Sequence, residues 1–244
     1  MTLKRPDDPL PAVEGEFESA RDRYNFGMKK HGSTAPRFVR GRALIITLVA
    51  LAALLGGLLA ARSILERSVE YQVASIYPRS PEIQAFELVD ADGRPFTERD
   101  LEGNITLLFF GFTNCPDICP DTLSELATAM NKLEAMRVER KPDVVFVSVD
   151  AERDAGESMR EYVHFFDPSF RAVTGDDPAL ARLTSQVGAM YVRGEADESG
   201  YYAVDHSGMV VIIDSQGRMI GRFPPGSGAD GVAADLFKLQ RAGA

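Results

Sequence analysis

The chain has 244 residues, which is long for one compact domain and short for two, so we expect one folded domain with appendages. Hydrophobic residues make up 45% of it and charged residues 26%, a balance that excludes a wholly disordered or collagen-like chain. Residues 1–42 hold 9 Lys and Arg against 6 Asp and Glu, which leaves 18 against 30 for the rest. This acidic remainder, which has no basic stripe with interleaved aromatic residues, argues against nucleic-acid binding.

Residues 1–42 show no apolar periodicity and carry prolines and scattered charges, so we expect a disordered tail. The six acidic residues of this tail argue against an organellar transit peptide, because such peptides are poor in acids. The sequence therefore favours the plasma (inner) membrane of a bacterium over an organelle.

Residues 43–61 run for 19 residues without a charge, which is long enough for a helix to cross a bilayer. The run has no polar face and is bracketed by Arg42 and Arg62, which argues against a buried core helix. A cleaved signal peptide is disfavoured because 42 residues precede the run. Lys and Arg are more frequent just before it than just after it, so the positive-inside rule predicts a cytoplasmic N-terminus and a periplasmic C-terminal domain.

Beyond the span, residues 62–81 are expected to form a connector and residues 82–244 an exported folded domain. Alternating apolar residues on either side of Asp92-Gly93 indicate a hairpin, and a second hairpin is expected near the C-terminus. Strands and helices alternate between the two hairpins, which predicts an α/β, thioredoxin-like sandwich of three layers. The expected strands are residues 105–110, 144–149, 170–173, 210–213 and 219–223, and the expected helices are residues 121–133, 158–166, 179–187 and 230–241.

The only two cysteines, Cys115 and Cys119, occupy the loop between the first buried strand and the helix that follows it. Thiolates are soft ligands, and two of them four residues apart can share a metal ion or form a disulfide. Pro120 suits the first turn of a helix, so the helix amides and dipole are expected to lower the pKa of both thiols. The alternative from spacing alone is an inert disulfide or two buried thiols.

Copper fits this donor set better than zinc. A closed structural zinc site needs four protein ligands, and the expected domain has only two Cys and two His, His164 and His206. His31 would lie on the other side of the membrane. Cu(I) accepts two or three soft ligands, so both thiolates and one imidazole would suffice.

The two candidate histidines lie in different sequence contexts. His164 lies in a YVHFF stretch of an expected helix, where a partly buried structural histidine is the ordinary interpretation. His206 lies in VDHSG, at an expected loop just before a strand, and an isolated loop histidine is usually only solvated. Local pattern alone leaves the role of His206 open.

Three motifs resemble the signature of the Sco/SenC family: TNCPDICP at residues 113–120, SVDAERD at residues 148–154, and VDHSG at residues 204–208. The likeness extends over roughly residues 82–240. It implies that Cys115, Cys119 and His206 are the ligands of copper, as Cu(I) and Cu(II), and that the fold is thioredoxin-like. Ala151 departs from the proline that the family often has there, but it lies outside the metal motif. Asp117, inside the cysteine loop, is either a loop-shaping residue or a solvated turn residue.

The resemblance also implies a function, which is maturation of the binuclear copper centre of cytochrome c oxidase by a copper metallochaperone. The implied partners are the copper-bearing oxidase subunit and other copper chaperones or thioredoxin-like reductants. The alternative is a thiol-disulfide oxidoreductase that reduces the oxidase cysteines through a redox disulfide between Cys115 and Cys119. His206 separates the two, since a dithiol needs no imidazole, and a CxxxC spacing departs from the CxxC of dedicated oxidoreductases. A thioredoxin-like peroxidase has no positive sign in the sequence.

The expected topology can be tested with reporter fusions. A reporter that is active only outside the cytoplasm should work when fused after Ala244, and one that is active only inside should work near residue 30, because the positive charges hold the N-terminus in the cytoplasm. Enzymatic assay of both fusions in intact cells is the measurement. Reversed activities would contradict this topology.

Overall fold

The computed structural model describes residues 38–65, 70–198 and 201–244, and the tail expected to be disordered falls outside them over residues 1–37. The chain divides into two compact units, residues 1–67 and residues 68–244. The first unit contributes helix α1 (Phe38–Leu65), which extends beyond the expected span at both ends, so residues 38–42 are helical. Residues 42–62 of this helix are long and apolar enough to cross a membrane, by length and composition.

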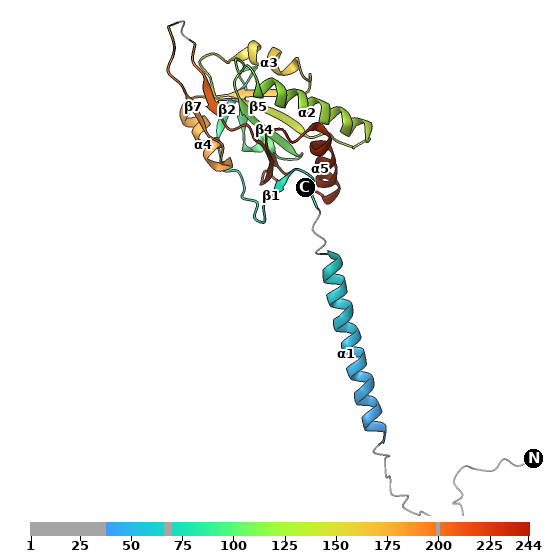
Figure 1. Ribbon diagram of the computed structural model, residues 1–244. Coiled ribbons are helices and arrows are strands. Elements are labelled where there is room, and N and C mark those ends of the chain that lie inside the picture. Colours follow the sequence, from blue (N-terminus) through green and yellow to red (C-terminus); the bar gives the residue numbers. More distant parts are fainter. Residues whose placement is uncertain (1–37, 66–69, 199–200) are drawn as a thin grey trace, which may run out of the picture. The chain divides into compact units, whose positions relative to one another are not determined.

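The second unit is built on an eight-stranded mixed sheet with the strand order β1-β10-β9-β4-β5-β6-β2-β3 (Figure 1). Strands β4, β5 and β6 are parallel, and the remaining neighbours in the sheet are antiparallel. The strands are β1 (Ser75–Ile76), β2 (Glu87–Asp90), β3 (Pro95–Thr97), β4 (Thr106–Gly111), β5 (Asp143–Ser148), β6 (Arg171–Thr174), β9 (Val210–Ile213) and β10 (Met219–Phe223).

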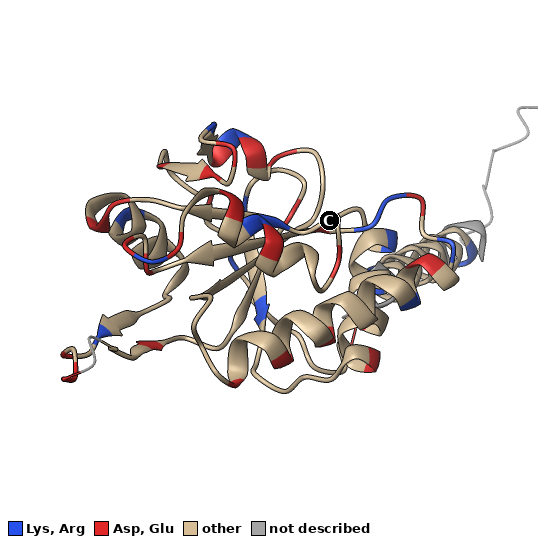
Figure 2. Ribbon diagram, turned by 90° about the horizontal axis from the view of Figure 1, so that it is seen from above, with Lys and Arg blue, Asp and Glu red and all other residues tan. Residues whose placement is uncertain are grey.

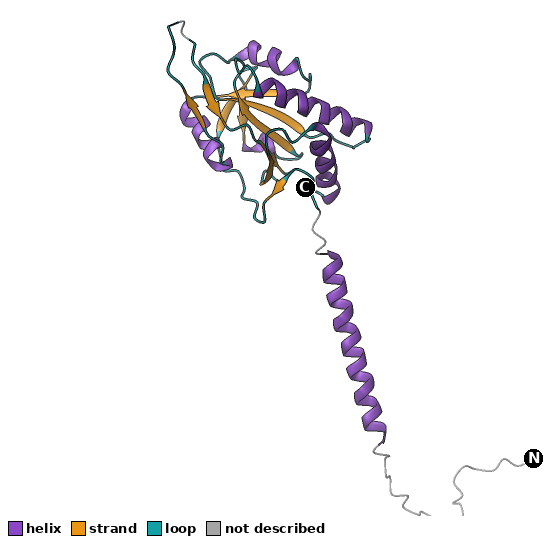
Figure 3. Ribbon diagram, viewed as in Figure 1, coloured by secondary structure: helices purple, strands orange, loops and turns teal. Residues whose placement is uncertain are grey.

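Helices cover both faces of this sheet, which gives the three layers expected from the sequence (Figure 3). Consecutive crossovers between parallel neighbours are right-handed, so α2 (Ile118–Ala135) and α3 (Gly156–His164) lie on the same face. Helix α5 (Ala229–Ala242) packs against α2, while α4 (Asp177–Val187) contacts β2. A short 3₁₀ turn, η1 (Glu98–Leu101), follows β3.

The core is centred on β4 and β5, whose residues from Leu107 to Phe110 and from Val144 to Val147 are buried. Strands buried on both faces read as continuous apolar runs, which is why the sequence predicts these two so clearly. Acidic residues outnumber basic ones in the sequence of residues 68–244, and they are spread over several elements of the second unit (Figure 2). Both expected hairpins, β2-β3 and β9-β10, are confirmed.

A separate two-stranded sheet, β7 (Tyr191–Arg193) with β8 (Val204–His206), was not expected from the sequence. Each strand has three residues, which is too short for alternation to be recognised. This hairpin places the VDHSG motif at the end of a strand, and it therefore matters for the site described below.

The folded domain begins earlier than the boundary expected at Glu82. Strand β1 lies inside the expected connector at residues 62–81 and pairs with β10 through Ser75↔Arg222 and Ile76↔Gly221. Just before it, the buried carboxylate of Asp235 accepts backbone hydrogen bonds from Gln72, Val73 and Ala74, at 2.8, 2.8 and 2.9 Å. These contacts join positions more than 160 residues apart, so no local pattern in the sequence reveals them, and they place the start of the folded domain at about residue 70.

Asp235 also ties stability to pH. Burial by itself would raise the pKa of Asp235, but the three backbone N–H groups and Lys238 outweigh it, and the pKa is lowered from its ordinary value. The carboxylate therefore stabilises the fold above its unfolded-state pKa, and this contribution is lost as the pH falls through the lower pKa of the folded state.

Removing residues 70–81 should destabilise the folded domain. A fragment of residues 82–244 should unfold with a free energy about 3 kcal/mol lower than a fragment of residues 70–244, because the buried Asp235 carboxylate loses three donors. Urea unfolding of both fragments at pH 7 is the measurement. Equal free energies of unfolding would show that the segment before Glu82 does not belong to the folded domain.

Candidate metal centre

The two cysteines lie where β4 passes into α2. Cys115 is in the loop and is 9% exposed, whereas Cys119 is the second residue of α2 and is fully buried. The helix starts at Ile118, two residues before the start expected from Pro120. Gly111 at the end of β4 makes room for this turn, since a Cβ atom there would lie 2.5 Å from the Sγ atom of Cys119.

His206 reaches the same place from a distant part of the chain. It is the last residue of β8, not a loop residue as expected, and it pairs with Tyr191 across the hairpin. The imidazole is half-buried and packs edge-on against the rings of Phe112 and Phe109, with centroids 5.9 and 6.3 Å away. The hairpin and two aromatic rings therefore orient the imidazole.

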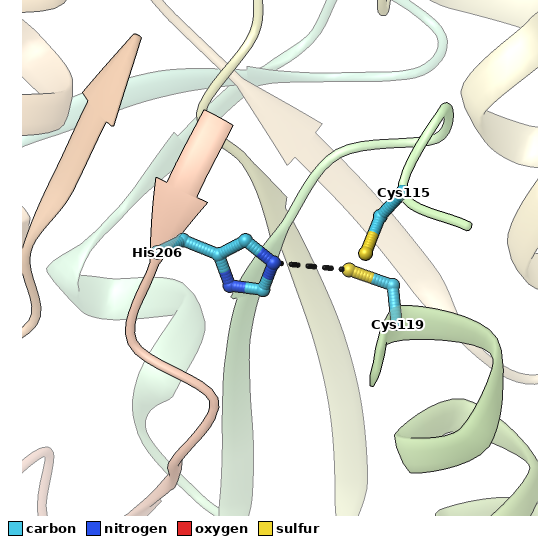
Figure 4. A group of neighbouring side chains, drawn as sticks. All are labelled: Cys115, Cys119 and His206. Carbon is cyan, nitrogen blue, oxygen red and sulfur yellow. Dashed lines mark hydrogen bonds between the residues drawn. The ribbon is translucent and has the colours of Figure 1, made fainter. Parts of the chain in front are cut away.

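The ligand atoms of Cys115, Cys119 and His206 all lie within 4.8 Å of one another (Figure 4). The Nε2 atom of His206 is 3.4 Å from the Sγ atom of Cys119, although the two residues are 87 positions apart in the chain. Within the described residues, this is the only group of three or more His, Cys, Asp or Glu side chains that is close enough to hold a metal ion. Two sulfurs and one imidazole form a soft donor set.

The electrostatics of Cys119 differ from the expectation that the start of the helix lowers its pKa. Burial raises the pKa of the Cys119 thiol, the Phe112 N–H lowers it only in part, and negative charge on Cys115 raises it further. Desolvation of a buried thiolate outweighs the helix dipole, so the expected lowering is wrong for Cys119. Without a cation the thiol stays protonated, and a metal ion that binds must displace this proton.

His206 is held neutral by its surroundings. Burial lowers the pKa of its imidazole, although hydrogen bonds with the backbone at Ser207 and Phe110 oppose this effect. The Nδ1 atom lies 3.4 Å from the carbonyl oxygen of Ser207, so a proton on Nδ1 suits that acceptor. The Nε2 lone pair then faces Cys119 and is free to bind a metal ion.

The buried carboxylate of Asp154 fixes the start of the cysteine loop through hydrogen bonds. Asp154 is fully buried and accepts hydrogen bonds from the backbone N–H of Thr113 at 2.7 Å, from the Thr113 hydroxyl, and from the Ser148 hydroxyl at 2.7 Å. Thr113 precedes Cys115 by two residues. The SVDAERD motif signals this region in the sequence, but its contact with the cysteine loop could not be read there.

A second cluster links the same motif to the hairpin that carries His206. Arg153 pairs with the buried Asp150 and donates to the carbonyl oxygen of Tyr202 at 3.0 Å. Its guanidinium lies 3.7 Å from the ring centroid of Tyr202 and 5.5 Å from that of Phe112. Phe112 also packs against His206. Arg153 therefore contacts both the cysteine loop, at Phe112, and the hairpin that carries His206, at Tyr202.

The structure also shows where His164 and Asp117 lie, two residues considered in the sequence. His164 is exposed at the end of α3, so the expectation of a partly buried histidine is wrong, and it does not join the group around Cys119. Asp117 is the N-cap residue of α2, but its side chain makes no capping hydrogen bond. It is exposed beside the loop and does not hold the cysteines in place.

Removing the Asp154 carboxylate should destabilise the fold around the cysteine loop. Asp154→Ala should lower the free energy of unfolding by about 3 kcal/mol, because the buried donors of Thr113 and Ser148 lose their acceptor. Urea unfolding is the measurement. The exposed neighbour Glu152→Ala is the control and should change the free energy by less than about 0.5 kcal/mol. If Asp154→Ala is as stable as the parent, the hydrogen bonds to Asp154 do not contribute to the stability of the fold.

A family model described as SCO1/SenC matches residues 75–241 of the chain. An SCO2-like protein of Rickettsia typhi is 34% identical over 141 residues, which cover 57% of this chain and 68% of that protein. The crystal structure of Arabidopsis thaliana ScoI with copper bound is 32% identical, with a TM-score of 0.62, over 66% of this chain and 99% of that one. Bradyrhizobium japonicum ScoI with copper bound is 30% identical, with a TM-score of 0.58, over 65% of this chain and 99% of that one.

The similarity to these solved structures confirms the thioredoxin-like fold expected from the sequence. The matched residues begin at β1, in agreement with the corrected start of the folded domain. Because the family model covers more than half of the chain, the protein belongs to the SCO1/SenC family.

Proposed function

We propose that this protein is a copper metallochaperone that binds copper through Cys115, Cys119 and His206 and delivers it to cytochrome c oxidase. The observation that carries the proposal is the convergence of two thiols and one imidazole within 4.8 Å in a largely buried site. The similar ScoI structures with copper bound support the choice of metal. Maturation of the binuclear copper centre, in the copper-bearing subunit, is the proposed outcome.

The donor set fits copper better than it fits zinc. A tetrahedral zinc site needs a fourth ligand, and no fourth His, Cys, Asp or Glu joins the group among the described residues. The buried carboxylate of Asp154 already accepts hydrogen bonds from Thr113 and Ser148. Two thiolates and a neutral imidazole satisfy Cu(I), and the imidazole suits Cu(II) as well.

The two cysteines are suited to different parts of a transfer reaction. Cys119 is fully buried in the first turn of α2, and it keeps its position beside His206. Cys115 lies on the loop and is the more exposed thiol, so a ligand from a partner protein can displace it first. Stepwise exchange of one sulfur at a time keeps the copper ion bound throughout.

The surface beside His206 offers a docking place for the copper-bearing subunit or for another copper chaperone or thioredoxin-like reductant. A recess of about 250 Å³ is lined by residues of the β7-β8 hairpin, including His206. Met190 and Val192 at this recess are 75% and 65% exposed. Exposed apolar residues beside a transfer site suit a transient protein contact.

We further propose that the folded domain works in the periplasm, held to the inner membrane of a bacterium by the span at residues 43–61. The tail at residues 1–42 would then be cytoplasmic. The length and composition of α1 support the membrane anchor, and the excess of Lys and Arg before it supports the orientation.

The alternative function is that of a thiol-disulfide oxidoreductase acting on the oxidase cysteines. It is supported by the two sulfurs, which are both free and lie close together opposite His206 (Figure 4). The imidazole distinguishes the two functions, because a redox dithiol does not need His206. Copper binding and disulfide formation use the same sulfurs and exclude each other.

Replacing His206 tests the proposal. In His206→Ala, Cu(II) affinity should fall by more than the roughly 10- to 100-fold that is typical of outer-shell changes, because a direct ligand is lost. Cu(I) should remain on the two thiolates with lower affinity, and the disulfide should still form. Anaerobic competition titration of the purified full-length protein, with thiol counting after mild oxidation, is the measurement.

His164→Ala is the matched control, because His164 is exposed and remote from the ligand group. It should leave both copper affinities unchanged. If His206→Ala binds both copper states as the parent does, the three-ligand site is refuted and the oxidoreductase function is favoured.

A further inference from the structure

Arginines without carboxylate partners gather at one place on the surface of this acidic domain. A hollow of about 550 Å³, here called the arginine hollow, is lined by Arg137, Arg140 and Arg241. All three are exposed, and none of them forms a salt bridge with a residue that the structure describes. Among the described residues that line the hollow, Glu139 is the only acidic one, so three positive side chains face one negative one.

Two of the guanidinium groups are held by contacts that leave most of their donors available. Arg140 donates from Nη1 to the carbonyl oxygen of Gly103 at 3.0 Å, and Arg241 lies over the ring of Phe237, 5.6 Å from its centroid. The side-chain amide of Gln240 donates to the backbone carbonyl of Arg140, which joins α5 to the loop before β5. Because a guanidinium group has five N–H donors, the hollow can still bind an anionic ligand.

Arg137 has an unusual backbone conformation. It follows the C-cap residue of α2 and has a φ of 57°, the only positive φ of a residue other than glycine in the part of the chain that the structure describes. Glycine is preferred just beyond the end of a helix, because it has no Cβ atom to clash in this conformation. Residues that carry such strain are concentrated at functional sites, so the arginine side chain at this position calls for an explanation.

Chain connectivity limits the distance between α5 and the end of the proposed membrane span. Lys238 donates from Nζ to the carbonyl oxygen of Glu70 at 2.6 Å, and Glu70 follows Arg62, where the apolar segment ends, by only eight residues. Eight residues extend over at most about 28 Å. Arg241 is three residues beyond Lys238 and lies beside it on the helix. The chain is therefore short enough for the arginine hollow to reach the lipid surface.

We propose that the arginine hollow docks on the anionic phospholipid headgroups of the membrane that holds the span. Guanidinium groups bind phosphate through paired hydrogen bonds, and an anionic surface supplies the negative charge that the three arginines lack in the protein. Their attraction to the headgroups opposes the repulsion that the acidic remainder of the domain experiences there. The inference rests on the proposed membrane anchor and does not depend on copper.

Docking at this place leaves the metal centre uncovered. Residues 103–105 of the hollow lie just before β4, whereas the two cysteines follow the other end of that strand. Strand β4 has six residues, so its two ends are about 20 Å apart. A domain held at the arginine hollow therefore keeps its metal centre away from the lipid surface and open to partner proteins.

A tryptophan reporter in the full-length protein tests the docking, because the chain contains no tryptophan. Met136→Trp places the reporter at an exposed position of the hollow, and the protein is inserted into lipid nanodiscs in which a few headgroups carry a dansyl group. Energy transfer from tryptophan to dansyl should be stronger in discs that contain phosphatidylglycerol than in discs of pure phosphatidylcholine. About 1 M salt should remove this difference, because it shortens the Debye length to about 3 Å.

Replacing the three arginines together, as Arg137→Gln, Arg140→Gln and Arg241→Gln, should abolish the difference between the two kinds of disc. Each arginine at an anionic surface changes the ratio of docked to undocked protein about fivefold, so this ratio should fall about 100-fold. Fluorescence of the triple variant on the Met136→Trp background is the measurement.

The matched control combines Arg79→Gln, Arg99→Gln and Arg182→Gln, which remove the same charge from exposed positions outside the hollow and should preserve the difference. Equal energy transfer in both kinds of disc would overturn the inference. An equal loss in both triple variants would also overturn it, since net charge alone would then explain the effect. A protein that does not enter the discs would refute the membrane anchor and the docking with it, whereas copper binding by the same protein would still test the metallochaperone function separately.

Discussion

A thiolate at Cys119 has to be compensated by a cation, because its sulfur is removed from water. Burial raises the pKa of this thiol, and the start of α2 does not reverse the effect. The nearby positive charge of Arg153 is held by Asp150 and lies against Phe112, so it is not placed on the sulfur. Without a metal ion, the sulfur of Cys119 therefore carries a proton or forms a disulfide. A metal ion that binds here supplies the positive charge that a thiolate needs.

Several elements of the domain fix the position of the Cys119 sulfur and its neighbours. Strand β4 ends at Gly111, whose lack of a side chain lets the first turn of α2 approach closely. Asp154, at the turn after β5, holds the loop through Thr113, while the β7-β8 hairpin brings His206 from the far side. The parallel pair β4-β5 aligns these contributions, because the carboxyl ends of adjacent parallel strands lie at one edge of a sheet.

Much of the fold could be predicted from the sequence, since β4 and β5 are continuous apolar runs and α2 has a clear apolar periodicity. Short elements could not: β1, β7 and β8 have two or three residues and depend on partners distant in the chain. The cysteine pair was evident from spacing, but His206 required a family resemblance. The raised pKa of Cys119 follows from burial, which no local pattern reveals.

Three states compete for the same two sulfurs: the protonated dithiol, the disulfide and the proposed copper complex. Burial disfavours any state that leaves a bare charge on Cys119, which excludes a free thiolate as a long-lived species. The disulfide does not need His206, whereas the proposed copper complex uses it as a ligand. An imidazole that burial keeps neutral beside the two sulfurs is therefore hard to explain for a redox dithiol alone. It is suited to a site whose working state contains a metal ion, and this is why we favour a metallochaperone over an oxidoreductase.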